Sequence, residues 1–354
     1  MLPASTVSDT KATRDTEATR DTAEARNTAE ARDSGLPGHV SLARQSRGGM
    51  VESIHYGSLI CIDAQGNTLL SLGDPLSPIY PRSALKPLQA VAMHRAGLRL
   101  PTDQLALAAA SHSGAAVHQE TARAILAGHG LDESALANSP DMPYGVPERE
   151  QWLRENKSAT HLAQNCSGKH SAMVATCSLN SWPIESYLDP AHPLPRLIRD
   201  VVEELTGDQI TQTSTDGCGT EVFALSLKAM ATAFSAMITS KAGTAEYEVV
   251  SAMMGRPHLV AGEGRDVTAL MRAIPGLLAK DGFEGVQLVA LADGRTIALK
   301  VSDGGDRARM PVAAEALRLL GVDRQTLAAF RSQQVFGGGR PVGLLEAIPM
   351  DLPV

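Results

Sequence analysis

The chain has 354 residues, a length that suits one large domain or two modest ones. It is 43% hydrophobic and 20% charged, as soluble globular proteins are, and its formal net charge of −7 argues against a nucleic-acid partner. No apolar run predicts a transmembrane helix, and the N-terminus lacks the apolar stretch of a signal peptide, so we expect a cytoplasmic protein with no membrane partner. Its four cysteines are too few for a disulfide framework, which leaves free thiols, core packing or metal ligands.

The first 46 residues differ in composition from the rest. ATRDT occurs at 12–16 and 18–22, and TAEAR occurs at 22–26 and 28–32. A short polar repeat of this kind cannot bury enough apolar surface to offset the entropy lost on ordering. We therefore predict a disordered tail over 1–46 and a single globular domain over 47–354.

The globular part opens with a predicted hairpin. Strands are expected at 57–62 and 68–72, separated by a short turn. A helix is expected from Ser83 to about Gly97, because apolar residues recur there at helical spacing. Pro87 is compatible with this helix because the amide donors of a first helical turn have no partners in any case.

Helical patterns dominate the middle of the chain and a second predicted hairpin follows them. Strands are expected at 286–292 and 296–301, joined by Asp-Gly-Arg. Hairpins at both ends with helices between them predict an α/β fold with an antiparallel sheet flanked by helices, rather than repeated βαβ units. The expected helices are 116–129, 148–156, 168–179, 195–206, 221–238, 245–255, 266–273, 308–320 and 324–331.

The first motif with chemical potential is Ser83-Ala84-Leu85-Lys86. A spacing of three at a helix start places the serine and the lysine on one face. A serine becomes a useful nucleophile when a base removes its proton, and a buried lysine can supply that base. Ser-x-x-Lys also arises by chance, and then the serine only caps the helix and the lysine is solvated.

Five further motifs combine glycines with polar or charged residues at the ends of apolar segments, as active-site loops do. Several also have structural explanations: Ser113 could cap a helix, Cys166 could be packing, and Lys280 could be a surface lysine. The motifs are ASHSG at 110–114, NCSGKH at 165–170, TDGCG at 215–219, GEGR at 262–265 and KDG at 280–282.

Together the motifs resemble the rhizobial-type L-asparaginases of the asparaginase II family, which are distinct from the bacterial threonine-dependent enzymes. The resemblance covers about residues 49–301 and implies a fold similar to that of serine β-lactamases and glutaminases. It also implies a homodimer that hydrolyses L-asparagine to L-aspartate and ammonia. The motifs that carry it are RGGMVES at 47–53, RSALKPLQA at 82–90, ASHSG at 110–114, NCSGKH at 165–170, TDGCG at 215–219, VAGEGR at 260–265 and KDGFEG at 280–285.

The same resemblance assigns residues to roles. It implies two serine–lysine pairs in one pocket, with Ser83 as the nucleophile and Lys86 as its base, and with Ser111 and Lys280 relaying protons. It implies a zinc site beside the pocket that aids substrate positioning without performing the chemistry. The zinc ligands would be Cys166, Lys169 and Cys218.

Asparagine is a zwitterion, so its recognition needs charges of both signs. We expect its carboxylate to meet Arg82 or Arg265 and its ammonium to meet Asp216 or Glu263, and we place His170 among the substrate-binding residues. The chain departs from the family in its N-terminal repeat and at 114–115, where Gly114 and Ala115 replace residues that are often acidic.

Two other functions fit parts of the sequence. One is another amidohydrolase of the same fold, such as a glutaminase or a penicillin-recognising acylase, although Lys-Thr-Gly and Ser-Asp-Asn triplets are absent. The other is a non-catalytic zinc-binding protein built on Cys166 and Cys218. The complete set of two serines and two lysines argues against it.

Overall fold

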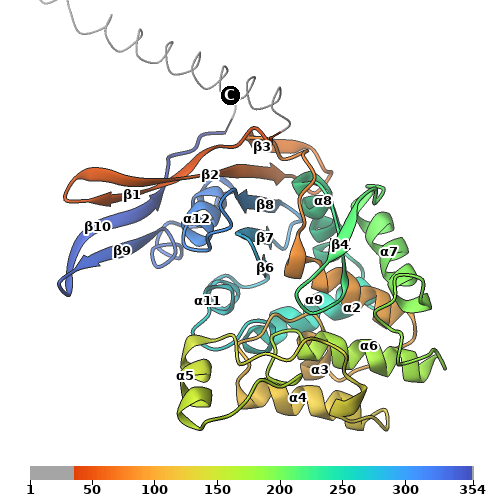
Figure 1. Cartoon of the computed structure of the whole chain (residues 1–354). Coiled ribbons are helices and arrows are strands. Elements are labelled where there is room, and N and C mark those ends of the chain that lie inside the picture. The colour runs from red at the N-terminus through yellow and green to blue at the C-terminus, as the bar shows by residue number, and fades with distance from the viewer. Residues whose placement is uncertain (1–35, 353–354) are drawn as a thin grey trace, which may run out of the picture.

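The computed structural model describes residues 36–352, so most of the predicted tail lies outside the described residues. Its centre is an antiparallel sheet in the order β6-β7-β8-β2-β1-β10-β9, with β3 paired to β2 beside this path. The sheet is flanked by helices (Figure 1), which confirms the predicted fold class. Its strands are β1 (Val40–Arg47), β2 (Met50–Ile62), β3 (Thr68–Leu72), β6 (Leu278–Gly282), β7 (Val286–Ala290), β8 (Thr296–Val301), β9 (Ser332–Gly337) and β10 (Arg340–Ala347).

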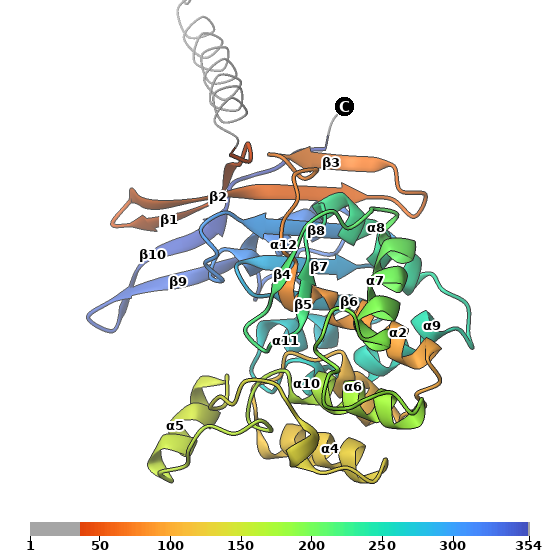
Figure 2. The ribbon, with the colours of Figure 1, turned by 45° about the vertical axis from the view of Figure 1, so that its right-hand side comes forward.

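The long strand β2 joins two parts of the sheet with different environments. Its second half pairs with β3 and β8. The residues Leu59 to Ile62 are buried there because other segments of the chain cover both faces of the sheet. Its first half pairs with β1 and is mostly exposed. Figures 1 and 2 show this first half projecting from the helical body together with β1, β10 and β9, as an arm.

Helices α8 and α12 lie against the sheet, α11 and α9 contact its edge strand β6, and the helices together form a body beneath the sheet. Helix α8 contacts β2, β7 and β8, while α12 contacts β7, β8, β10 and β1. Within the body, α2 contacts α6, α7 and α9, so the helix that carries the Ser-x-x-Lys motif lies centrally. The helices are α2 (Lys86–Arg95), α3 (Thr102–Ala108), α4 (Ala116–Ala127), α5 (Val146–Arg154), α6 (Ser167–Leu179), α7 (Pro193–Thr206), α8 (Leu227–Ile238), α9 (Ala245–Gly255), α10 (Pro257–Val260), α11 (Asp266–Ala273) and α12 (Arg309–Leu319). Short 3₁₀ helices occupy η1 (Arg82–Leu85) and η2 (Glu133–Ala135), and β4 (Thr213–Thr215) pairs with β5 (Glu221–Phe223).

Some predicted elements were wrong or missed. The helix expected over 221–238 begins only at Leu227, because residues 221–223 form β5 and Ser226 caps α8 through the amide of Ala229. Residues 324–331 form turns, so the helix predicted there is wrong. β1 lies before the predicted boundary at residue 47, and its pairing with β2 and β10 orders this segment. None of the helices in residues 36–352 is long and apolar enough to cross a membrane.

Candidate active site

The Ser-x-x-Lys motif lies where η1 passes into α2, which agrees with the predicted helix start near Ser83. The residue before the serine, Arg82, has φ +53°, a left-handed backbone conformation that is uncommon outside glycine. Such conformations persist where the surrounding structure imposes them, and they cluster at functional sites. Ser83 is buried beneath the surface and Lys86 is almost completely buried.

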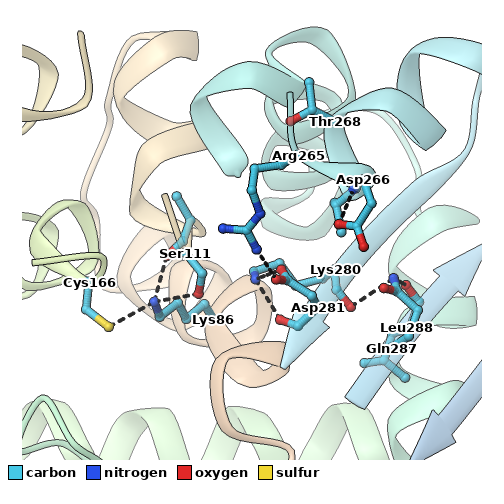
Figure 3. A network of polar contacts seen from close by, with 12 residues as sticks. Lys86, Ser111, Cys166, Arg265, Asp266, Thr268, Lys280, Asp281, Gln287 and Leu288 are labelled. Atoms are coloured by element: carbon cyan, nitrogen blue, oxygen red, sulfur yellow. Dashed lines mark hydrogen bonds and ion pairs between the residues drawn. The ribbon is translucent and has the colours of Figure 1, made fainter. Parts of the chain in front are cut away.

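The amine of Lys86 joins three segments that are far apart in the sequence (Figure 3). Its Nζ donates to the carbonyl of Ala110 at 2.7 Å, to Ser111 Oγ at 2.9 Å and to Cys166 Sγ at 3.0 Å. Among the described residues, no hydrogen bond joins this amine to Ser83. The hydroxyl in direct contact with Lys86 is therefore that of Ser111.

Ser83 and Ser111 face the same small hollow. Its volume is about 20 Å³, room for about one water molecule and far below the roughly 300–1,000 Å³ typical of ligand pockets. A larger hollow of about 410 Å³ lies between α4 and α5 and contains none of the predicted catalytic residues. The residues that line the smaller one are Ser83, Ser111, Tyr144, Asn165, Asp281, Gly282, Phe283 and Asp306.

Lys280 lies on β6 at the border of this hollow, with its amine held by the next residue. Its Nζ donates to the Asp281 carbonyl and to Asp281 Oδ1, both at 2.7 Å. Burial lowers the pKa of Lys280 to about 8; Asp281 opposes this shift and the nearby Lys86 adds to it. At mildly alkaline pH this amine can therefore accept a proton.

Asp281 is a central residue of the site that the sequence analysis missed. Its Oδ2 accepts a hydrogen bond from Arg265 at 2.8 Å, and its Oδ1 accepts one from the amine of Lys280. Burial alone would raise the pKa of the Asp281 carboxyl, but Lys280, Arg265 and Arg309 hold it below its usual range. The carboxylate thus neutralises cations from three different segments. The sequence feature that could have identified Asp281 is its position beside Lys280 in the KDG motif.

Arg309 on α12 forms an outer layer behind this cluster. It is almost fully buried, donates to Asp266 Oδ2 at 2.6 Å and contacts the Gln287 side chain. Gln287 Nε2 in turn donates to the Lys280 carbonyl at 3.3 Å. The strand that carries Lys280 is therefore fixed through its backbone as well as through its side chain (Figure 3).

Two arginines, each stacked on an aromatic ring, belong to the region around the hollow. Arg82 lies 5.4 Å from the ring centre of Phe283 and donates to Asp216 Oδ1 through Nε at 2.8 Å. Arg265 lies 4.9 Å from the ring centre of Tyr144. Within residues 36–352 the Nη1 of Arg265 is buried and has no hydrogen-bond partner. It is a donor available to an anion.

The predicted metal ligands come together at the start of α6. Lys169 Nζ lies 3.2 Å from Cys218 Sγ and donates to Thr220 Oγ1 at 2.7 Å. A hydrogen bond from Cys166 lowers the pKa of the Cys218 thiol, and the cation of Lys169 adds to the effect. The same bond and burial raise the pKa of Cys166. Of the two thiols, that of Cys218 is therefore the more readily ionised.

His170 stands beside these ligands. Its Nδ1 lies 2.8 Å from the hydroxyl of Tyr187, and its Nε2 is buried without a partner among the described residues. Burial lowers its pKa to about 4, so the ring is neutral near pH 7. Residues 36–352 contain no group of three or more His, Cys, Asp or Glu arranged to hold a metal, so the predicted set depends on the Lys169 amine.

The structure does not bring Glu263 to the hollow. Glu263 lies between Gly262 and Gly264, both with positive φ, and this turn directs its side chain to Arg272 at the surface. The carboxylates that line the hollow are Asp281 and Asp306. His170 also lies outside the lining.

Gly114, a position at which the resemblance led us to expect an acidic residue in other members of the family, has no space for a side chain. Its φ is +86°, and a Cβ there would lie 2.8 Å from the carbonyl oxygen of Ala163 and from the Cα of Pro143. The loop that carries Ser111 therefore packs closely against neighbouring backbone.

Comparison with known proteins places the chain among the amidohydrolases. More specifically, it belongs to the L-asparaginase II family, whose profile matches residues 43–347. Among solved structures, a β-lactamase from Mycobacterium bovis is similar at 15% identity and a TM-score of 0.32, over 71% of this chain and 88% of that one. EstCE1, a hydrolase with promiscuous acyltransferase activity, is similar at 12% identity and a TM-score of 0.32, over 80% and 94%. No curated protein sequence matches the chain.

The charge cluster around Asp281 leads to a stability prediction. Asp281→Asn leaves the cations of Lys280 and Arg265 buried without their carboxylate, and we expect it to lower the free energy of unfolding by about 3–5 kcal/mol. Asp281→Asn combined with Lys280→Met removes one of the uncompensated cations and should recover part of the loss. Urea denaturation of the two variants and the wild type measures this. A loss below about 1 kcal/mol in the single variant would contradict the central role of Asp281.

Proposed function

We propose that the protein is an L-asparaginase that hydrolyses L-asparagine to L-aspartate and ammonia with a serine nucleophile and a lysine base. The observation that carries the proposal is that Ser83 and Ser111 line one small hollow while Lys86 is hydrogen-bonded to Ser111. Lys280 lies next in sequence to the lining residue Asp281 and is hydrogen-bonded to it. Membership of the L-asparaginase II family supports it. We further propose that the enzyme is cytoplasmic and homodimeric.

In this mechanism Ser83 attacks the carbon of the side-chain amide. The proton of its hydroxyl passes through Ser111 to Lys86, along the 2.9 Å contact between those two residues. Backbone amides near Ser83 and in the 216–219 turn stabilise the oxyanion, and donors of this type contribute on the order of 3 kcal/mol each. Ammonia leaves with a proton, and a water molecule then hydrolyses the aspartyl ester, with Lys280 taking part in the proton relay.

Free hydrogen-bonding atoms beside the hollow suit the two charges of the substrate. The unpartnered Arg265 Nη1 is the donor we assign to the α-carboxylate. Asp216 accepts bonds from Arg82 and from the Gly217 amide at Oδ1, and its Oδ2 has no partner within the described residues. We assign this second oxygen to the α-ammonium.

The chemistry of the cysteine cluster fits a zinc ion. Sulfur and nitrogen donors are the ligands that zinc takes in proteins, and Cys166, Cys218 and Lys169 lie together with the unpartnered Nε2 of His170 beside them. We propose that Cys166, Lys169 and Cys218 hold the metal. When bound, zinc would polarise and orient a substrate group next to the serines.

A glutaminase is the nearest alternative activity, because its substrate differs from asparagine by one methylene. A single methylene changes the binding free energy by only about 1–3 kcal/mol, so the two substrates need a direct comparison. We favour asparagine because the chain belongs to the L-asparaginase II family.

The reaction and its nucleophile are tested together by ammonia release. We expect the wild type to release ammonia faster from L-asparagine than from L-glutamine, with a rate that rises from pH 7 to 9 as Lys280 loses its proton near pH 8. Ser83→Ala should lower kcat by about 10⁴-fold or more, because the covalent step is lost. The matched control is Ser139→Ala at an exposed position, which should keep wild-type turnover.

The outcome identifies the nucleophile. If Ser83→Ala keeps near-native turnover and Ser111→Ala is inactive, the serine in contact with Lys86 is the nucleophile and our assignment is wrong. Mass spectrometry of acid-quenched enzyme, which locates the aspartyl ester, decides the same point independently. No ammonia from either substrate would overturn the proposed function.

The role of Arg265 is tested by a substrate without its carboxylate. 3-Aminopropanamide is asparagine with a hydrogen in place of the α-carboxylate. We expect wild-type kcat/KM to favour asparagine over it by about 10–100-fold, the contribution of a charge-assisted hydrogen bond. Arg265→Gln should lose most of this preference. Arg123→Gln, a matched change on the exposed side of α4, should retain it. Equal preference in Arg265→Gln and wild type would assign the carboxylate to Arg82 instead.

The proposed zinc site predicts a defined effect of metal removal. The wild type should contain about one zinc per chain by elemental analysis, and Cys218→Ser should lose most of it. Chelation should raise KM for asparagine while the circular dichroism spectrum stays native, because the metal positions substrate. Unfolding on chelation would instead indicate a structural zinc, and a zinc-free active wild type would contradict the site.

A further inference from the structure

The hollow between Ser83 and Ser111 is too small for asparagine. Its volume of about 20 Å³ admits about one water molecule, and asparagine is several times larger than water. A residue of the wall must therefore move before the substrate can enter. The wall residues that are exposed at the surface are Tyr144, Phe283 and Asp306.

Two of these exposed residues stand on segments that neighbouring parts of the chain hold in place. Phe283 begins the turn from β6 to β7, and the carbonyl of Gly285 in this turn accepts a hydrogen bond from the Val301 amide at 2.9 Å. Asp306 lies just before α12. Its carbonyl accepts from the Arg309 amide at 3.1 Å, and its Oδ1 lies 3.6 Å from the buried Nε of Arg309.

Tyr144 stands on a segment with much weaker anchoring, residues 142–159, which we call the lid segment. Two backbone hydrogen bonds of 3.1 Å between Asp141 and Thr160 join its ends, and it contains α5. Helix α5 has no buried residue, and within residues 36–352 it packs extensively against no other helix or strand. Figures 1 and 2 show it at the margin of the helical body. Segments with few buried contacts open at a low cost in free energy, so this part of the wall is the one that can move.

The lid segment is fastened to the loop that carries the second serine. The Gly145 amide donates to the carbonyl of Ser113 at 2.8 Å, and Ser113 Oγ donates to Glu148 Oε1 at 2.7 Å. Apart from contacts at the base of the lid segment, these are the hydrogen bonds that join it to the rest of the described chain. Ser113 lies two residues after Ser111, so the fastening is beside the site.

Arg265 connects the lid segment with the substrate. Its guanidinium lies 4.9 Å from the ring centre of Tyr144, and its Nη1 is the donor assigned above to the α-carboxylate. A carboxylate bound at Nη1 fixes the guanidinium against the ring and so favours the closed position of Tyr144. A ligand shifts an equilibrium only through its different affinities for the two states, and this contact supplies the difference.

We propose that the lid segment opens to admit asparagine and closes over it, and that Tyr144 is a positioning residue that then orders the substrate through Arg265. This inference rests on the proposed function and adds one residue to it. The structure is the closed state, which accounts for the small volume of the hollow.

One added methyl group tests the closed state. A Cβ at Gly145 would lie 2.7 Å from Ser113 Cβ and closer still to the Glu148 carboxylate, while the φ of −65° at Gly145 suits any residue. Gly145→Ala should therefore hold the lid segment open. We expect it to raise KM for asparagine by at least about 10-fold, with a smaller change in kcat. Gly255→Ala, where a Cβ meets nothing within 4 Å, is the matched control and should keep the wild-type KM. An unchanged KM in Gly145→Ala would overturn the proposal.

The role of Tyr144 is tested with two substrates. Tyr144→Ala should raise KM for asparagine by about 5-fold, the contribution of a cation–π contact, and Tyr144→Phe should restore the wild-type value because it keeps the ring. For 3-aminopropanamide, which has no α-carboxylate, we expect Tyr144→Ala and the wild type to have the same KM. A purely structural role would affect both substrates alike, so equal increases would contradict positioning through Arg265.

Protease protection follows closure without turnover. Arg154 and Lys157 are exposed trypsin sites in the lid segment. In the wild-type full chain, L-aspartate at about ten times its dissociation constant should slow cleavage there by about 10-fold, and in Gly145→Ala it should not. Equal cleavage with and without L-aspartate, in a wild type that hydrolyses asparagine, would exclude the lid. A wild type that releases no ammonia would instead overturn the proposed function. The same cleavage assay with unreacted L-asparagine then decides the lid separately, because a lack of protection there would also exclude it.

Discussion

The buried amine of Lys86 is the point at which the separate parts of the site meet. Its Nζ lies within hydrogen-bonding distance of the Ala110 carbonyl, the Ser111 hydroxyl and the Cys166 sulfur, which come from two loops of the helical body. A buried lysine is tolerated only where such partners are supplied, so both loops must adopt one arrangement around it. The same contacts connect the serines with the cysteine cluster. A change in either loop is therefore transmitted to the other through this amine.

The balance of charge explains why Lys280 is surrounded by more charged residues than Lys86. Lys280, Arg265 and Arg309 place three cations close to one buried carboxylate, Asp281. Burial of charge is unfavourable unless each charge is paired and hydrogen-bonded. The carboxylate of Asp266 pairs with Arg309 and so meets this condition. Within residues 36–352, Arg265 Nη1 and Arg309 Nε are the buried donors of this cluster without a hydrogen bond, and Arg309 Nε lies 3.6 Å from Asp306 Oδ1. Arg265 contacts Asp281 and Tyr144, which line the hollow. A substrate anion bound there can therefore supply the missing hydrogen-bond partner of Arg265 Nη1.

The sequence predicted the parts of this structure that depend on local pattern. The hairpin around residue 65, the helix from Ser83 and the helix over 245–255 follow from turn chemistry and apolar spacing, and they are present. The arm strands were missed because β1, β9 and β10 have one exposed face and little apolar alternation, so their order comes from pairing with distant strands. The motifs located Ser83, Lys86, Ser111 and Lys280, but the partners Asp281 and Arg309 were missed. Their importance depends on tertiary proximity, which no spacing along the chain expresses.

The division between arm and body has a physical rationale. The hollow lies between the helical body and the end of β6, where burial lowers the pKa of Lys280. The arm contributes nothing to that environment, yet β2 runs through both regions without interruption, and its residues 57–62 pair with β8 inside the core. Through β8 and β7 the paired strands continue from β2 to β6, which carries Lys280 and Asp281. The second lysine is therefore positioned by the same sheet that extends into the arm.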